Sequence, residues 1–282
     1  IRKVILDPVL SMVRAMKQLA AGDFTVRMSY KGWMRPLELR EFAVAFNTAA
    51  EELDGTEILR KDFINNFSHE FKTPITSLGG FADLLLEDEA MPAEERRQYL
   101  QIISSESHRL AALANSVLAL SRVETQTILT ESEPFPLAEQ LRQSALMVEQ
   151  KWSGKKKIVL TVETPEDDFC ILNGNEAMLK EVWVNLLDNA FKFSPEGGAV
   201  SLTLQNKPAA VKVTVTDHGS GMDEATKAHI FDQFYQGDTS HKTEGNGLGL
   251  AMAQKIVALH KGTITVDTAP GRGTTFTVQL PK

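Results

Sequence analysis

Hydrophobic residues in the first 56 positions recur at helical intervals in two runs, over residues 6–16 and 39–53. The second run steps by three and four residues in alternation, which is the spacing of a heptad seam. Such a seam is covered by partner helices rather than by a globular core. Residues 22–36, between the runs, contain two glycines and a proline and predict an irregular connector. The pattern predicts a helix, a connector and a second helix.

Two further amphipathic stretches, at residues 54–90 and 94–124, also repeat with helical spacing. The short break between them contains Pro92. Two amphipathic helices joined by a short turn predict an antiparallel hairpin. Because one hairpin buries little apolar surface, we expect two copies of the chain to pair as a four-helix bundle, which makes the protein a homodimer.

Residues 131–136 carry two prolines within three positions, which breaks the helical period and predicts a linker or domain edge. Beyond it the period changes to alternation. Strands are expected at residues 158–162, 200–204, 211–215, 264–266 and 276–280. Helices are expected near residues 137–150, 175–193 and 248–260. This half of the chain is therefore predicted to be a mixed sheet covered by helices.

Length, charge and cysteine content exclude several classes of protein. A chain of 282 residues with 43% hydrophobic residues suggests about two domains with real cores. Its net charge of −7, without a long basic block, argues against broad nucleic-acid binding. The single Cys170 forms no internal disulfide, and no Cys/His cluster has zinc-ligand spacing, as expected in the cytosol. No apolar run approaches the roughly 20 residues of a membrane span.

The first group with chemical potential is Phe-Ser-His-Glu-Phe-Lys-Thr-Pro, at residues 67–74. His69 lies two positions from each phenylalanine, about 200° around a helix, so it should project away from the buried stripe. An exposed imidazole is largely neutral at pH 7, and its ring nitrogen can attack phosphorus. Thr73 shares its face at i+4, and Pro74 cannot donate to the carbonyl of Glu70, so the helix should bend there. Taken alone, a surface histidine is more often part of a solvated helix face.

A second group lies on the helix predicted over residues 175–193. Asn185, Asn189 and Lys192 follow one another by four and three positions, so one face offers two amide oxygens and an ammonium group. Mg²⁺ prefers oxygen ligands and accompanies nucleotide phosphates, which a nearby lysine also neutralises. The alternative is an ordinary polar helix face.

Two glycine-rich segments complete the set. Asp217, Gly219 and Gly221 follow a predicted strand, where glycines admit a flat ligand and the aspartate can accept a hydrogen bond from an amine such as that of adenine. Alone, this is only a turn. The segment Gly245-Asn-Gly247-Leu248-Gly249 opens a predicted helix, and its backbone N–H groups suit a polyphosphate. It lacks the Lys-Ser/Thr of a P-loop and the third glycine of a Rossmann motif, and the chain has no His-Arg-Asp or Asp-Phe-Gly of eukaryotic-type kinases.

In this order the four groups resemble the sequence boxes of the histidine kinase family, with residues 230–235 similar to its phenylalanine box. The resemblance covers roughly residues 54–282. It implies a multidomain α plus α/β protein: a dimeric hairpin that bears a phosphoacceptor His69, then an ATP-binding α/β sandwich of the kind shared with type II topoisomerases. We predict domains at residues 1–56, 57–128 and 132–282.

The resemblance also implies the site roles. ATP and Mg²⁺ would be the cofactors, with Asn185 and Asn189 holding the metal, Lys192 the phosphates and Asp217 the adenine. The remaining nucleotide contacts would come from Gly219, Gly221, Gly245, Gly247, Leu248 and Gly249. Glu70 would assist His69, and Thr73 would orient water for dephosphorylating the partner, a response regulator that carries the acceptor aspartate.

Residues 1–56 are similar to a HAMP module, a plain dimerising coiled coil being the alternative. Such modules usually follow a membrane-spanning helix, so residues 1–6 could be the end of one and the chain the cytoplasmic portion of a cell-membrane protein. One departure concerns residues 236–244, where the family often carries arginines. Here Gln236 is neutral, and Lys242 could supply the missing cation.

Two other functions fit parts of the pattern. An ATPase of the same sandwich class could act as a nucleotide-driven clamp without phosphohistidine, but it would not need His69 or its hairpin. A catalytically weak scaffold or phosphatase-biased sensor is suggested by the missing arginines.

Overall fold

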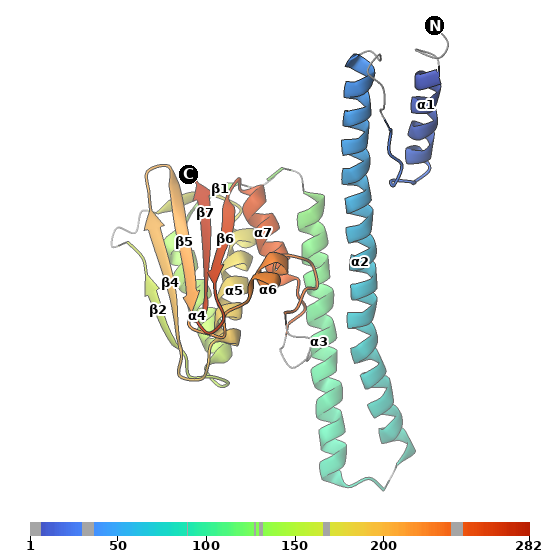
Figure 1. Cartoon of the computed structure of the whole chain (residues 1–282). Helices are drawn as coiled ribbons and strands as arrows, with labels where there is room; N and C mark the ends of the chain where they lie inside the picture. The colour runs from blue at the N-terminus through green and yellow to red at the C-terminus, as the bar shows by residue number, and fades with distance from the viewer. Residues whose placement is uncertain are drawn as a thin grey trace. The chain divides into compact units, whose positions relative to one another are not determined.

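The computed structural model describes residues 7–29, 37–88, 90–126, 128–129, 132–165, 170–237 and 245–282. The chain divides into two compact units, Ile1–Lys72 and Thr73–Lys282, and each is described by itself. Figure 1 labels the helices and strands. Two of the sequence predictions, the membrane-proximal residues 1–6 and the phosphate cation Lys242, lie outside the described residues.

The first unit contains α1 (Asp7–Ala20) and the start of α2 (Leu37–Glu87), as predicted for helix, connector and helix (Figure 1). The expectation of a separate helix from residue 54 is wrong, because α2 continues without a break from Leu37 to Glu87. Gly55 lies inside this helix, and a Cβ there would meet nothing within 4 Å. A single helical glycine weakens a helix by about 1 kcal/mol relative to alanine, which is too little to end it.

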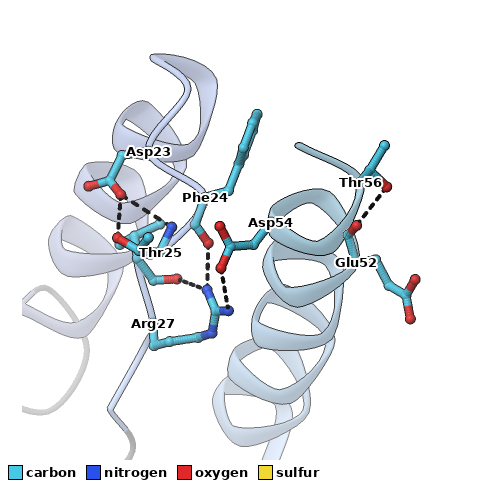
Figure 2. Close-up of polar contacts among 8 residues, drawn as sticks. Asp23, Phe24, Thr25, Arg27, Glu52, Asp54 and Thr56 are labelled. Atoms are coloured by element: carbon cyan, nitrogen blue, oxygen red, sulfur yellow. Dashed lines mark hydrogen bonds and ion pairs between the residues drawn. The ribbon is translucent and has the colours of Figure 1, made fainter. Parts of the chain in front are cut away.

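The connector is fastened to α2 by polar contacts. Asn47 accepts a hydrogen bond from the Met28 amide (2.7 Å) and donates one to its carbonyl (3.0 Å). Figure 2 shows Arg27 pointing at Asp54 on α2, with 3.8 Å between Nη2 and Oδ2, and Nη1 donating to the Phe24 carbonyl at 2.6 Å. The connector also contributes Val26 and Met28 to a small apolar cluster whose other members are Ala15, Leu19, Phe46 and Ala50.

In the second unit, the last part of α2 and α3 (Ala93–Thr125) form the predicted hairpin. The rings of Phe81 and Tyr99 lie 5.1 Å apart across it. Pro74 is buried inside α2, which passes through it. The helix predicted at residues 94–124 is confirmed within one residue at each end.

The predicted mixed sheet is also confirmed. Five strands run in the order β2-β4-β5-β7-β6, with β2 parallel to β4 and the other neighbours antiparallel. Their bounds are β2 Val159–Glu163, β4 Ala199–Asn206, β5 Ala210–Asp217, β6 Thr263–Thr268 and β7 Thr274–Pro281. The helices α4 (Leu137–Trp152), α5 (Glu176–Phe193) and α7 (Gly249–Leu259) cover one face of this sheet (Figure 1).

The core lies between these helices and the sheet. Trp183 is fully buried on α5 and donates from Nε1 to Gln140 Oε1 on α4 at 2.8 Å. Leu186, Leu187 and Ala190 on α5 are also buried. Alternate side chains of β4 and β5 are buried, as expected for a sheet covered on one face.

Three small elements were not predicted. Residues Glu133–Pro136 form β1, which pairs antiparallel with β3 (Ile171–Gly174), so these residues are not an irregular linker, and the alternative of a domain edge stays a prediction. Proline is tolerated at the edge of a two-stranded sheet because its missing N–H is not needed there. The short α6 (Glu224–His229) begins at Asp223, whose Oδ1 accepts a hydrogen bond from the Thr226 amide.

Candidate active site

His69 lies on α2 in the first unit, and its side chain is exposed. Phe63, Phe67 and Phe71 form a half-buried aromatic stripe on the same helix, with neighbouring ring centroids 6.1 Å and 4.3 Å apart. The prediction that His69 projects away from this stripe is confirmed. Ser68 on one side of His69 is exposed and Glu70 on the other is half-buried, and the imidazole itself is accessible from solvent.

Asn185, Asn189 and Lys192 lie half-buried on α5 in the second unit. The helix is anchored near them by Asp188, whose Oδ1 accepts hydrogen bonds from Lys151 Nζ (2.7 Å) and Trp152 Nε1 (2.8 Å) at the end of α4. Anchoring one side of α5 in this way fixes the rotation of the helix and the direction in which the amides project.

The C-terminal end of α5 is capped by a lysine that the sequence analysis missed. Lys156 Nζ donates to the carbonyls of Phe191 (3.3 Å), Lys192 (2.5 Å) and Ser194 (2.8 Å). A cation at a helix C-terminus satisfies the unpaired carbonyls and opposes the negative end of the helix dipole. No local pattern singles out Lys156 within its run of three lysines, because its carbonyl partners lie more than 30 residues away.

The second glycine segment lies directly against this face of α5. A Cβ placed on Gly249 would come 2.9 Å from Asn185 Oδ1, and one on Gly245 would come 2.9 Å from Lys192 Nζ. A larger residue at either position would displace the end of the asparagine or lysine side chain, and Gly245 also has φ +148°, which favours glycine. The structure therefore brings the asparagine, the lysine and the exposed backbone of this segment together.

Contacts with the preceding segment hold these glycines in place. Gly247 has φ +64°, and its carbonyl accepts a hydrogen bond from the Phe234 amide at 2.9 Å. Gln236, noted above as a neutral departure, donates from Nε2 to the Gly245 carbonyl at 3.0 Å. Leu248 is 2% exposed, so its side chain packs in the interior beneath the glycine segment. Only its backbone could therefore contact a ligand.

The first glycine segment follows β5 and also meets α5. Gly219 packs so tightly against the Phe193 carbonyl, and Gly221 against the Ala269 carbonyl, that a Cβ at either position would collide. Asp217 is buried, and its Oδ1 accepts hydrogen bonds from the amides of Gly219 (2.9 Å) and Thr274 (3.2 Å). Sequence reasoning could not find the Thr274 contact, which depends on the pairing of β5 with β7.

Burial raises the pKa of the Asp217 carboxyl above its usual value, and the two amide hydrogen bonds partly oppose that rise. Both hydrogen bonds use Oδ1, so Oδ2 is the oxygen that could accept from a ligand amine. A recessed acceptor beside two glycines is suited to the edge of a planar, amine-bearing base.

The donor set fits a magnesium nucleotide. Mg²⁺ is held by a few oxygen ligands together with phosphates and water, and the Asn185 and Asn189 amide oxygens are of this kind. Within the described ranges, no group of three or more His, Cys, Asp or Glu side chains could hold a metal by itself. In those same ranges, no helix has the length and apolarity needed to cross a membrane.

Comparison with known families matches three parts of the chain. The model of histidine kinase-, DNA gyrase B- and HSP90-like ATPases matches residues 174–282. The model of the His Kinase A (phospho-acceptor) domain matches residues 59–126, and that of the HAMP domain matches residues 1–55.

Among curated proteins, the chain is similar to the heme sensor protein HssS of Staphylococcus saprophyticus. The two are 33% identical over 280 residues, which make up 99% of this chain and 58% of that protein. The chain therefore spans less than two thirds of the length of this relative.

Two solved structures are also similar. The histidine kinase ThkA in complex with the response regulator TrrA superposes with a TM-score of 0.64 and 26% identity, covering 78% of this chain and 61% of that one. Full-length ShkA in complex with AMPPNP gives a TM-score of 0.56 and 30% identity, covering 80% and 45%.

Proposed function

The chain belongs to the sensor histidine kinase family, and from that premise we propose that it transfers the γ-phosphoryl group of ATP to its own His69 and then to an aspartate of a response regulator. The observation that carries this proposal is the convergence of Gly245 and Gly249 on Lys192 and Asn185. Backbone N–H groups and an ammonium group together suit a polyphosphate, and the neighbouring Asn185 amide oxygen suits the metal ion that accompanies it.

Each part of the nucleotide has a proposed partner. Asp217 Oδ2 accepts a hydrogen bond from the exocyclic amine of adenine, with Gly219 and Gly221 allowing the base to approach. Lys192 and the amides of residues 245–249 neutralise the phosphates. Asn185 and Asn189 would hold Mg²⁺ through their amide oxygens, and the ion would offset the charge of the phosphates. Lys242 adds a further cation.

The chemical step follows from the exposure of His69. When the nucleotide domain delivers ATP, an unprotonated ring nitrogen attacks the γ-phosphorus, a P–N bond forms, and the bond to the β–γ bridging oxygen breaks to release ADP. The proton on the other ring nitrogen passes to the Glu70 carboxylate. Little covalent chemistry is left to the protein, so the rate depends on positioning and charge neutralisation.

The proposal extends to the partners. The similarity to ThkA, whose structure is a complex with a response regulator, supports a receiver domain as the phosphoryl acceptor. The match to the phosphoacceptor-domain model supports a homodimer. Thr73 is exposed one helical turn after His69 and would orient water for dephosphorylating the regulator. The HAMP match supports a membrane-attached protein of which these residues form the cytoplasmic portion.

The test is incubation of the protein with Mg²⁺ and γ-labelled ATP, beside a His69→Gln variant. We expect acid-labile label on the wild type and none on the variant, while the variant still binds ATP. Hydrolysis of ATP without protein label would instead identify a nucleotide-driven clamp. Neither label nor hydrolysis would favour a scaffold, and both of these results contradict the proposal.

A further inference from the structure

His260 joins the two helices that carry the nucleotide motifs. It caps the C-terminal end of α7, and its Nδ1 lies 2.8 Å from the Ile256 carbonyl oxygen of the same helix. Its Nε2 lies 3.0 Å from the amide nitrogen of Asn175, the N-cap residue of α5. The side chain is only 8% exposed. The imidazole is thus a buried bridge between the end of one helix and the start of the other.

The two hydrogen bonds define the tautomer of this histidine. A carbonyl oxygen can only accept, so Nδ1 carries the proton, and a backbone N–H can only donate, so Nε2 is unprotonated. Both ring nitrogens are satisfied in the neutral form alone. The ring also packs against the backbone, since a Cβ on Gly174 would come 2.9 Å from its Cδ2.

The bridge lies at one end of an antiparallel helix pair whose other end is the nucleotide site. The rise is about 15 Å from Asn175 to Asn185 along α5, and about 16 Å from His260 back to Gly249 along α7. Gly249 closely approaches Asn185 at the far end. A helix fixed at both ends can neither slide nor rotate on its neighbour, so the bridge holds the second glycine segment in register with α5.

We propose that His260 is a positioning residue for nucleotide binding, acting through Asn175 to hold α7 in register with α5. The proposal rests on the function proposed above. It assigns to a histidine outside the ATP site the task of keeping Gly249 against Asn185. Loss of the bridge leaves the Asn175 N–H buried without its acceptor, which favours a shifted or loosened α7.

Protonation breaks the same bridge. Burial lowers the pKa of His260, and its hydrogen bond to the Ile256 carbonyl opposes this only in part. Glu133 on β1, Glu176 at the start of α5, Lys255 on α7 and the following Lys261 are exposed, whereas Lys180, Asp188 and Lys192 further along α5 are half-buried. Because the folded pKa is below the usual value of 6.5, the bridge is intact above that value and is lost as pH falls through the folded pKa.

Two variants separate the bridge from simple filling of space. His260→Gln places an amide oxygen near the position of Nε2 and can still accept from the Asn175 N–H. His260→Asn is shorter, overlays the Nδ1 end of the ring and cannot reach Asn175. His108→Asn makes the same replacement at an exposed position of α3 and serves as the control.

The experiment measures hydrogen exchange at the Asn175 amide and Mg·ATP affinity on the full chain at about pH 8. For His260→Asn we expect exchange at least tenfold faster and Kd raised about fivefold, with His260→Gln close to the wild type. Lowering the pH should weaken ATP binding by the wild type more than by His260→Gln. Similar values for the Asn and Gln variants, or unchanged exchange, would overturn the positioning role. If the wild type does not bind ATP, the proposed function is wrong. The hydrogen-exchange data still decide in that case whether the bridge exists.

Discussion

The N-terminal helices and the C-terminal sheet region differ in how much apolar surface each buries within one chain. In residues 7–72, the apolar cluster around Phe46 is small, and α1 presents an apolar groove to solvent. Large exposed side chains there include Val9, Leu10, Val13, Met16, Phe42, Leu53, Ile58 and Ile64. In residues 132–282, by contrast, three helices and a five-stranded sheet enclose a continuous core that includes Trp183, Leu186, Leu187 and Phe191.

The difference shows which part needs a partner. A heptad seam that stays exposed in one chain is completed by a second helix pair, and we expect that to be a second copy of this chain. The sheet region encloses its own core within one chain. It is nevertheless in contact with the helices, because α3 packs on α7 and Glu124 on α3 accepts a hydrogen bond from Gln233 at 2.6 Å.

The largest expected effect is a loss of stability confined to the sheet region. Trp183→Ala should destabilise the sheet region by about 3–5 kcal/mol, because it opens a cavity and leaves Gln140 without its indole partner. Denaturation followed by tryptophan fluorescence and circular dichroism should show this region unfolding first, with the helical signal of the N-terminal part retained. Leu146→Ala, at a 64% exposed position, is the control and should cost about 0.5 kcal/mol or less.

The next effect separates stability from binding within the sheet region. Asp217→Asn keeps the acceptor for the Gly219 and Thr274 amides but turns an NH₂ group toward the adenine amine, so ATP affinity should fall about 10–100-fold. The melting temperature should nevertheless rise at neutral pH, because a buried charge has been removed.

The pH dependence of Asp217→Asn follows from the raised pKa of Asp217. A raised folded pKa means that the contribution of Asp217 to stability is full below its usual value of 3.8 and is lost as pH rises through the folded pKa. The advantage of the Asn variant should therefore be absent in acid and grow with pH. Calorimetry across this range checks it, and a variant less stable than the wild type at neutral pH would contradict it.

Dilution tests whether the helical part depends on a second copy. For a fragment of residues 7–126, each tenfold dilution should weaken folding by about 1.4 kcal/mol, since the dimer is the folded species. A fragment of residues 132–282 should melt at the same temperature at every concentration. Concentration-independent melting of both fragments would remove the contrast between the two regions.

The smallest effect concerns one backbone position next to the proposed bridge. Lys261 has φ +57°, a conformation that costs a non-glycine residue about 1–2 kcal/mol. Lys261→Gly should therefore stabilise the sheet region by up to about 1 kcal/mol after the entropy of glycine in the unfolded chain is counted. A shift of a few degrees in melting temperature would be measurable, and no such gain is expected at exposed Lys255 on α7.

Much of the fold was predictable because it follows local periodicity. The helix at residues 94–124 and the strands of the large sheet were confirmed, since alternating and helical patterns report which face is buried. Strand β1 was missed because its two prolines argue against a strand, and β3 because it has only four residues; their pairing depends on tertiary structure. The continuity of α2 was missed because the apolar pattern changes near residue 54, where the heptad spacing gives way to the pattern of the hairpin helix. A change of pattern does not end a helix when no helix-breaking residue accompanies it.

The candidate site was predictable as residues but not as contacts. His69 could be placed outside the aromatic stripe from its spacing alone, and the structure confirms its exposure. The close approach of Gly249 to Asn185 joins positions 64 residues apart and depends on how α7 packs on α5. Gln236, which looked like a missing arginine, proved to support the Gly245 carbonyl.

The measurement that bears most directly on the central claim is the location of the phosphoryl group after incubation with Mg·ATP. Tandem mass spectrometry at neutral to alkaline pH, with ³¹P spectroscopy of the intact protein, should find one phosphoramidate on His69, which disappears in acid. Phosphate on a serine, threonine or aspartate, or an unmodified His69 in a protein that has bound and turned over ATP, would contradict the account.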